Sequence, residues 1–271
     1  MHHSLVIAHR GASGLAPENT LAAFQLAIDL GAEGIEFDIQ VSSDGQPVVI
    51  HDIHVNRTTN DTGLVAGFTA NELARMDAGG WFQKKLNRRP RPRALVKRIA
   101  GGGFARQSVP TLEAALKLMA SANLKRIYIE LKSRPASRED LLEATLALVR
   151  KFELERAVTL LSFDHEAIRF AKEAAPHIRT AATFPVTGRA LVTARSIIAA
   201  TKRAGADEAA LHFGIATRRS VTALHENGLN VSVWTVNREM IMRRLISFGV
   251  DAIMTNYPNR LIEVLQSPRR R

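Results

Sequence analysis

Acidic side chains stand at matching positions in two β-rich runs of the sequence. Glu36 and Asp38 are two residues apart in the run 34–39, and Glu130 lies in the run 126–131. Because successive side chains of a strand point to opposite faces, Glu36 and Asp38 share one face. The chain has no cysteine, and oxygen ligands without thiols favour Mg²⁺ or Ca²⁺ over softer metals. We therefore expect Glu36, Asp38 and Glu130 to bind a divalent cation; the alternative is a solvated or salt-bridged strand face.

Two histidines and two cationic side chains stand at the ends of similar runs. His9 and Arg10 end the first run, His51 ends a later one, and Lys132 shares the face of Glu130. Imidazole suits proton transfer near neutral pH, and a planar guanidinium matches phosphate oxygens. Together with a metal ion, these groups favour displacement at phosphorus. Each alone has a structural alternative, such as a hydrogen-bonded histidine or an Arg10–Glu18 ion pair, but their shared place at strand ends favours a site.

The elements that would position these residues alternate regularly along nearly the whole chain. This pattern predicts a parallel sheet with crossover helices, closed into a (β/α)₈ TIM barrel with its active site at the carboxyl ends of the strands. An open doubly wound sheet is the alternative, disfavoured because no G-x-G-x-x-G turn follows the first run. Nine candidate strands compete for eight places, so one early strand is expected to lie outside the barrel. The candidate strands are 5–8, 34–39, 48–50, 126–131, 157–162, 178–184, 208–213, 230–235 and 251–255.

Amphipathic helices are expected between these strands, the first with the apolar face Leu21, Phe24 and Ile28. The others are predicted at 70–77, 111–122, 138–152, 164–175, 188–203, 217–227, 238–247 and 258–266.

One segment interrupts this alternation and holds most of the excess charge. We expect residues 1–271 to form one domain, with 52–110 as a cap-like insertion. The net charge is +11, and nine basic residues with no acidic one lie within 83–106. Subtracting these nine leaves 28 basic against 26 acidic residues, so the remainder is nearly neutral. Prolines and three consecutive glycines predict that 83–106 is flexible. It is either a solvated loop or a means of attracting anionic substrate or membrane lipid.

No targeting or membrane segment is apparent. The N-terminal apolar run has four residues, too few for a signal-peptide core, and no run approaches the ~18 apolar residues that would span a bilayer. The absence of cysteine excludes a disulfide scaffold and a thiol nucleophile. We expect a cytoplasmic protein.

Several short motifs, in order over residues 5–258, resemble the glycerophosphodiester phosphodiesterase family. They are His9-Arg10-Gly11, Pro17-Glu18-Asn19-Thr20, Gly34-Ile35-Glu36-Phe37-Asp38, His51-Asp52, Arg57-Thr58-Thr59, Pro110-Thr111-Leu112-Glu113, Ile129-Glu130-Leu131-Lys132, Ser162-Phe163 and Val233-Trp234-Thr235-Val236-Asn237.

The resemblance implies a barrel of the phospholipase C-like type and a role for each candidate residue. A divalent metal ion, Mg²⁺ or Ca²⁺, would be bound by Glu36, Asp38 and Glu130, with His9 and His51 as the acid–base pair. Arg10 would contact the phosphate, Glu18 would position Arg10, and Lys132 and Trp234 would line the substrate pocket. In the family's usual mechanism a glycerol hydroxyl attacks phosphorus, the alcohol leaves, and water opens the cyclic phosphate to give sn-glycerol 3-phosphate.

Some residues near these motifs have other interpretations. Trp234 and Phe163 are equally compatible with the core, and Asn237 is expected to cap the following helix. Asn256 stands where the family commonly has Asp, so we expect a salt bridge or hydrogen bond there to differ, with no proposed catalytic position affected. The basic stretch is longer and more positive than the family's usual link.

The expected function is metal-dependent hydrolysis of glycerophosphodiesters, with no nucleic-acid partner and no obligate protein partner. A lysophospholipase D-type activity on lipid-bearing diesters is a close alternative, which an exposed apolar groove beside the site would favour. An inactive barrel that binds anionic membrane or nucleic acid through the basic stretch is a second alternative. That alternative leaves the histidines and carboxylates without a purpose.

Overall fold

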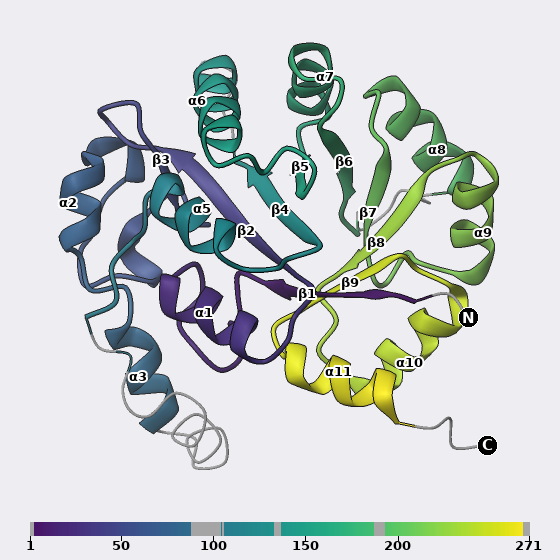
Figure 1. Cartoon of the computed structure of the whole chain (residues 1–271), viewed down its shortest axis with the longest axis horizontal. Helices are drawn as coiled ribbons and strands as arrows, with labels where there is room; N and C mark the ends of the chain where they lie inside the picture. Colours follow the sequence, from purple (N-terminus) through teal and green to yellow (C-terminus); the bar gives the residue numbers. More distant parts are fainter. Residues whose placement is uncertain (1–2, 88–103, 105, 133–136, 187–192, 268–271) are drawn as a thin grey trace.

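The fold is a closed parallel barrel, described by a computed structural model for residues 3–87, 104, 106–132, 137–186 and 193–267. The first strand pairs with both the second and the last, which closes the sheet (Figure 1). The (β/α)₈ prediction is confirmed, and the open-sheet alternative is wrong. The barrel strands are β1 (Leu5–His9), β2 (Gly34–Val41), β4 (Arg126–Leu131), β5 (Val158–Ser162), β6 (Arg179–Phe184), β7 (Glu208–His212), β8 (Asn230–Trp234) and β9 (Ala252–Thr255).

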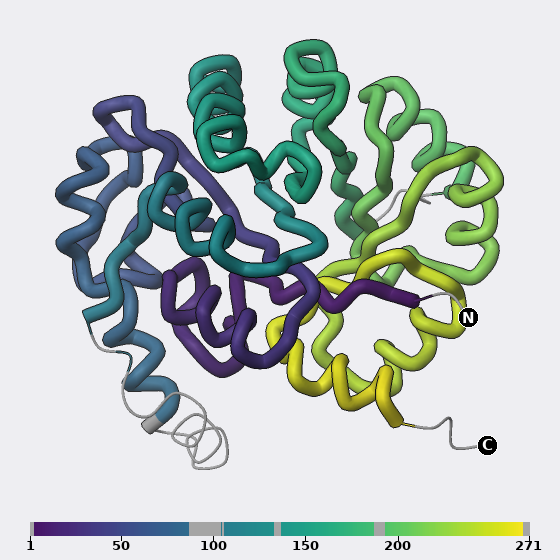
Figure 2. Tube along the Cα trace, viewed as in Figure 1, coloured from purple at the N-terminus to yellow at the C-terminus, as the bar shows by residue number. Residues whose placement is uncertain are grey.

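Helices surround the barrel and return the chain from one strand to the next (Figure 2). Threonine side chains at residues 20, 111, 193 and 217 accept backbone N–H bonds at the helix starts, as N-cap residues do. Of the predicted helix 188–203, residues 188–192 lie outside the described residues. In the described part of the chain, no helix has the length and apolar character to cross a membrane. The surrounding helices are α1 (Leu21–Asp29), α5 (Leu112–Ala120), α6 (Arg138–Lys151), α7 (His165–Ala174), α8 (Ala194–Arg203), α9 (Arg218–Glu226), α10 (Glu239–Phe248) and α11 (Pro258–Gln266).

The ninth strand lies outside the barrel, as the count of candidates predicted. β3 (Pro47–Val49) pairs antiparallel with the carboxyl-terminal end of β2, with Ile39 opposite Val49. After this hairpin the chain comes back toward the mouth, and the Ile50 N–H donates to the Asp38 carbonyl at 3.1 Å. His51 therefore reaches the barrel mouth by a chain reversal, and not at the end of a parallel barrel strand.

The segment between β3 and α5 builds a small structure beside the mouth. It contains the short helices η1 (Val55–Arg57), η2 (Val65–Gly67), α2 (Ala70–Arg75) and α3 (Gly80–Asn87). Most of the basic stretch, 88–103 and 105, lies outside the described residues. Its first residues, 83–87, form the end of α3, and Leu86 is buried in the main core. The flexibility of 83–106 stays a prediction. A separate apolar cluster unites this segment: Val48, Ile50, Val55, Val65, Ala70, Leu73, Met76, Ala78 and Val109.

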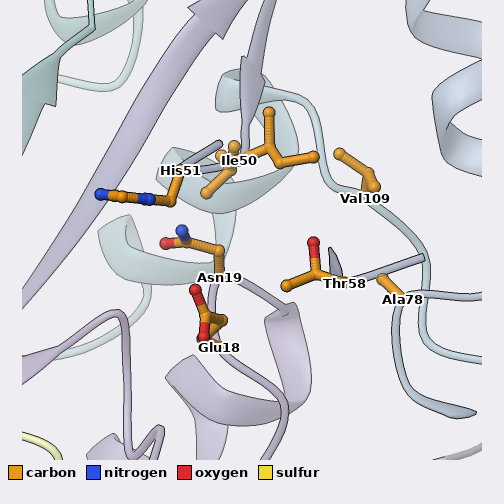
Figure 3. A pocket seen from close by; sticks show the side chains of 8 residues that line it. Glu18, Asn19, Ile50, His51, Thr58, Ala78 and Val109 are labelled. Atoms are coloured by element: carbon orange, nitrogen blue, oxygen red, sulfur yellow. The ribbon is translucent and has the colours of Figure 1, made fainter. Parts of the chain in front are cut away.

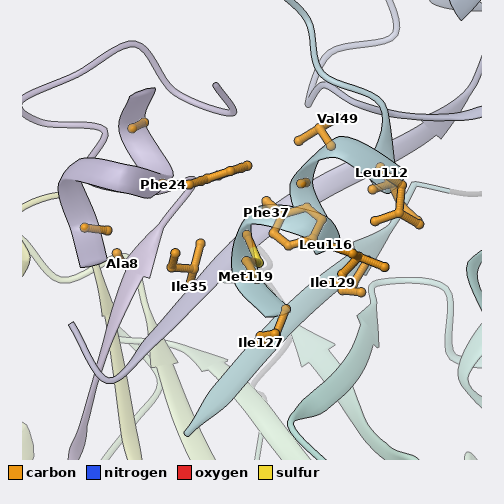
Figure 4. Packing of buried hydrophobic residues seen from close by; sticks show 14 of the residues in the cluster. Ala8, Phe24, Ile35, Phe37, Val49, Leu112, Leu116, Met119, Ile127 and Ile129 are labelled. Carbon is orange, nitrogen blue, oxygen red and sulfur yellow. The ribbon is translucent and has the colours of Figure 1, made fainter. Parts of the chain in front are cut away.

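Apolar side chains close the barrel below its mouth. Ile7, Tyr128, Leu161, Ala181, Ala210, Ala252 and Met254 form one buried cluster inside it. Outside the barrel, α1 and α5 pack on β2 and β4, with the rings of Phe24 and Phe37 5.4 Å apart (Figure 4). Toward the amino ends of the strands, the Tyr128 hydroxyl donates to the buried Glu208 carboxyl at 3.1 Å. A buried polar pair thus also lies at the amino ends of the strands, away from the histidines and carboxylates at the mouth.

Candidate active site

The structure brings all nine predicted site residues together at the carboxyl ends of the barrel strands. Seven of them line one pocket, and Asp38 and Glu18 contact that pocket through Arg10. The lining residues are His9, Arg10, Glu36, His51, Glu130, Lys132, Leu161, Phe163, Thr183, Trp234, Thr235 and Met254.

Three buried carboxylates form the acidic part of the site. Asp38 and Glu130 are register partners on β2 and β4, and Glu36 lies one inward position below Asp38. One carboxylate oxygen from each of the three lies within 4.8 Å of the others. Burial, followed by the charges of Asp38 and Glu130, holds the pKa of Glu36 well above its usual value. Burial and the charge of Asp38 raise the pKa of Glu130 to about 7.

These three carboxylates have the chemistry of a divalent-cation site. All their donor atoms are hard oxygens, and the crowding of like charges that raises the two glutamate pKa values is what a bound cation would relieve. The residues present therefore fit the metal ion that the sequence led us to expect.

Arg10 and Lys132 supply positive charge beside the carboxylates. Arg10 Nε lies 3.1 Å from Asp38 Oδ2, and Arg10 Nη1 donates to Glu18 Oε1 at 2.8 Å. Lys132 Nζ lies 2.6 Å from Glu130 Oε1 and 3.2 Å from Asp38 Oδ1. Burial works against ionisation of Asp38, but Arg10 and Lys132 outweigh it and lower the pKa of that carboxyl. The Arg10–Glu18 contact is the one that sequence analysis expected.

Arg10 owes its direction to an unusual turn. Arg10 has a φ of 56° and Gly11 a φ of 76°, the left-handed region that most side chains avoid. A Cβ atom on residue 11 would lie 2.6 Å from the Ala23 backbone, so only glycine fits there. The tight turn lets the strand end in His9 and direct the next side chain back over the mouth.

The two histidines face the pocket and differ in their second partner. His9 Nδ1 lies 2.7 Å from Asn256 Oδ1, and His51 Nδ1 lies 2.6 Å from Asp52 Oδ1. Burial, followed by the charge of Arg10, lowers the pKa of His9 from 6.5 to about 4. Burial also lowers the pKa of His51. His9 is therefore biased toward the neutral form, which can accept a proton, whereas the charge of Asp38 and the bond to Asp52 favour the protonated form of His51 and oppose the effect of its burial.

Three polar residues at the site were missed by sequence analysis. Asn19 Nδ2 donates to Asp38 Oδ2 at 2.9 Å. Arg57 bonds both Glu18 and Asp52, and its hydrogen bond lowers the pKa of Asp52 to about 2. The Asp52–Arg57–Glu18 network links His51 to Arg10. The motifs contained these residues, but their sequence separation gave no sign of these contacts.

Two expectations about asparagines are wrong. Asn237 does not cap α10, whose N-cap is Arg238 without a side-chain bond. Instead Asn237 Oδ1 accepts from the Asn256 N–H at 2.9 Å. Asn256 was expected to leave the predicted catalytic positions unaffected, yet it bonds His9 directly. The adjacent pairing of β1 and β9 causes this contact, because it sets the residues after Ala8 and Thr255 side by side.

Aromatic side chains form the wall opposite the carboxylates. The Trp234 ring meets Phe163 edge-on at 5.4 Å and His212 at 5.3 Å, and its Nε1–H donates to the Ala210 carbonyl at 3.1 Å. Trp234 therefore both packs in the barrel and lines the pocket. Phe163 is 43% exposed, so the pocket wall continues onto the surface.

A second hollow lies between the mouth and the β3–α5 segment (Figure 3). Glu18, Asn19 and His51 stand on its mouth side, and Thr58, Ala78 and Val109 on the other. Later residues of the β3–α5 segment therefore face His51 across this hollow.

Comparisons with known proteins agree with this geometry. A sequence model described as the "Glycerophosphoryl diester phosphodiesterase family" matches residues 9–260. YhdW of Bacillus subtilis is 37% identical over 261 residues, covering 95% of this chain and 96% of its own. A glycerophosphodiester phosphodiesterase of Caldanaerobacter subterraneus is 34% identical, covering 97% and 98%. The solved structure of an Oleispira antarctica phosphodiesterase, in complex with the product sn-glycerol-3-phosphate, superposes with a TM-score of 0.82 at 26% identity, covering 97% of each chain.

Proposed function

The chain belongs to the glycerophosphoryl diester phosphodiesterase family, and we propose that it hydrolyses glycerophosphodiesters to an alcohol and sn-glycerol 3-phosphate. The observation that carries this proposal is one pocket lined by two histidines, an arginine and a buried carboxylate cluster. The product in the Oleispira structure supports the glycerol phosphate half of the substrate.

In the proposed reaction, the chain's own groups bind the phosphodiester and move two protons. Arg10 and Lys132 attract the phosphate, and Trp234 contacts the glycerol carbons. One histidine, neutral at the start, takes the proton of the glycerol hydroxyl as its oxygen attacks phosphorus, and the other, protonated at the start, gives its proton to the departing alcohol oxygen. The roles reverse as water opens the cyclic phosphate. A divalent cation, Mg²⁺ or Ca²⁺, held by Glu36, Asp38 and Glu130 would offset charge on the phosphoryl oxygens.

A substrate panel tests this function. Purified protein supplied with Mg²⁺ or with Ca²⁺ is expected to release sn-glycerol 3-phosphate from glycerophosphocholine and glycerophosphoethanolamine, measured by a coupled dehydrogenase assay. Bis(p-nitrophenyl) phosphate serves as a comparison, because it has no glycerol hydroxyl for internal attack. No turnover of any glycerophosphodiester with either cation would contradict the proposal.

One observation favours a second candidate, lysophospholipase D-type activity. Phe163, at the pocket edge, is 43% exposed, and Ile53 and Val186, in loops at the same end of the barrel, are 51% and 54% exposed. Such side chains offer apolar contact to an acyl chain. A kcat/KM for lysophosphatidylcholine above that for glycerophosphocholine would favour this second activity.

The basic stretch gives a separate prediction about substrate attraction. Replacing the six basic residues within 88–98 by glutamine is expected to raise KM several-fold in about 10 mM salt. The difference should disappear in about 0.5 M salt, because screened charges attract anionic substrates weakly. Steady-state kinetics at the two ionic strengths, on the otherwise intact chain, make this comparison. An equal KM at low salt would leave the stretch as a solvated loop.

A further inference from the structure

Asn256 lies directly beside His9 because the barrel closes there. β1 and β9 are neighbouring parallel strands with Ala8 opposite Thr255, so the next residue of each strand reaches the mouth at the same height. The His9 Nδ1 and Asn256 Oδ1 atoms are 2.7 Å apart, a strong hydrogen-bond distance. In the described part of the chain, this is the single hydrogen bond to the His9 imidazole shorter than 3 Å.

The backbone of Asn256 is fixed independently of its side chain. Its N–H donates to Asn237 Oδ1 at 2.9 Å, and its carbonyl accepts from the Gly14 N–H at 2.8 Å. The side-chain amide is therefore held at a fixed place, from which it orients the imidazole. Replacing that side chain leaves both backbone bonds available, so a variant there tests the amide with little effect on the turn.

This contact decides which ring nitrogen of His9 faces the pocket with a lone pair. A neutral imidazole has one N–H and one lone pair, and an amide oxygen can only accept. Nδ1 must then be the donor, so Nε2 is unprotonated. Nε2 lies 3.4 Å from the Thr235 hydroxyl and 3.8 Å from Glu36 Oε2, on the pocket side of the ring.

The second histidine is held differently. His51 Nδ1 bonds the Asp52 carboxylate, which Arg57 holds in turn. A carboxylate orients the ring and also stabilises its protonated form, whereas an amide orients the ring without adding charge. Both imidazoles thus use Nδ1 for this contact, His9 with the Asn256 amide and His51 with the Asp52 carboxylate.

From this geometry we propose that Asn256 is a positioning residue that holds His9 in the Nδ1–H tautomer, with Nε2 ready to accept the proton of the attacking hydroxyl. Its kinetic consequence rests on the function proposed above. His51, with its carboxylate partner, is then the group that protonates the departing alcohol. Asn256 acts through His9 and does not contact the reacting atoms.

Kinetics of two substitutions test the role of the amide. Asn256→Ala is expected to lower kcat about 10- to 100-fold, as loss of such supporting contacts typically does, with KM within twofold. Asn256→Asp also offers an oxygen that accepts from Nδ1, so it should restore kcat to within about threefold of the parent. Asn230→Ala, at the exposed amino end of β8, is the matched control. An unchanged kcat with raised KM in Asn256→Ala, or an Asn256→Asp as slow as the alanine variant, would overturn the proposal.

Ring-nitrogen spectroscopy tests the inference without turnover. In ¹H–¹⁵N correlation spectra of the histidine rings, the signals lost in His9→Gln identify His9. We expect those signals to report Nδ1–H in the parent and in Asn256→Asp, and a shift toward Nε2–H in Asn256→Ala. An Nε2–H form in the parent, or an unchanged tautomer in the alanine variant, would refute the assignment. A parent protein that hydrolyses no glycerophosphodiester would refute the proposed function, while the spectra would still decide the tautomer.

Discussion

Replacing His51 by alanine is expected to lower kcat for glycerophosphocholine about 10²- to 10⁴-fold, the range that a positioned acid or base contributes. His51 lines the pocket, and its second ring nitrogen is fixed by Asp52. Alanine removes the proton-transfer group and leaves the carboxylates, Arg10 and Lys132 in place. KM should therefore change much less than kcat, and initial rates over a range of substrate concentrations measure both.

The structure offers a close control for this substitution. His54 is three residues further along, exposed, and is held by a backbone bridge to Leu64. His54→Ala should keep the parental rate, and circular dichroism should show both variants folded, since the His51 side chain is one-third exposed. A His51→Ala variant with the parental kcat would remove His51 from the proposed acid–base pair.

Much of this site follows from strand periodicity alone. Glu36, Asp38 and Glu130 could be predicted because two-residue spacing on a strand fixes a shared face, and because parallel barrel strands end at one mouth. His9 follows from the same rule. These predictions need only local sequence and the fold class.

The contacts that were missed depend on how distant segments meet. The His9–Asn256 bond spans 247 residues and exists because β1 closes against β9. The Asp52–Arg57–Glu18 network needs the β2–β3 hairpin, which turns the chain back to the mouth. An antiparallel β3 and a parallel one have the same apolar pattern, so periodicity could not predict this reversal.

Replacing Glu36 should have two opposite effects, a loss of activity and a gain in stability of the metal-free protein, because the three carboxylates are crowded. Glu36→Gln keeps the shape and an acceptor for the Arg10 N–H, which bonds Glu36 Oε2 at 3.1 Å. It removes one of three buried negative charges. We expect kcat/KM to fall about 10³-fold, since the metal ion's stabilisation of phosphoryl charge is worth several kcal/mol. Phosphodiester turnover with saturating Mg²⁺ or Ca²⁺ measures this loss.

The same substitution should raise the stability of the metal-free protein. The folded-state pKa of Glu36 lies above its unfolded value, so folding favours the protonated carboxyl. The contribution of Glu36 to folding stability is therefore fully present below its unfolded-state pKa of about 4.5, and it is lost as the pH rises through its folded-state pKa. In EDTA, the melting temperature of Glu36→Gln should match the parent near pH 4 and exceed it by a few degrees near pH 8, at about 2–4 °C per kcal/mol.

A glutamate at the opposite end of β2 provides the matched comparison. Glu33 is paired with Lys125. Partial burial favours the protonated carboxyl, but the bonds to Lys125 and His3 outweigh this effect and lower the pKa of Glu33. Glu33→Gln should therefore reduce stability at neutral pH and leave the response to added cation unchanged.

In the parent, Mg²⁺ or Ca²⁺ should raise the melting temperature, because a ligand that binds only the folded state stabilises it. Glu36→Gln should lose most of that increase. If the cation stabilised Glu36→Gln as strongly as the parent, the carboxylate cluster would not be its binding site, since the charge that the substitution removes is the one that the cation would neutralise.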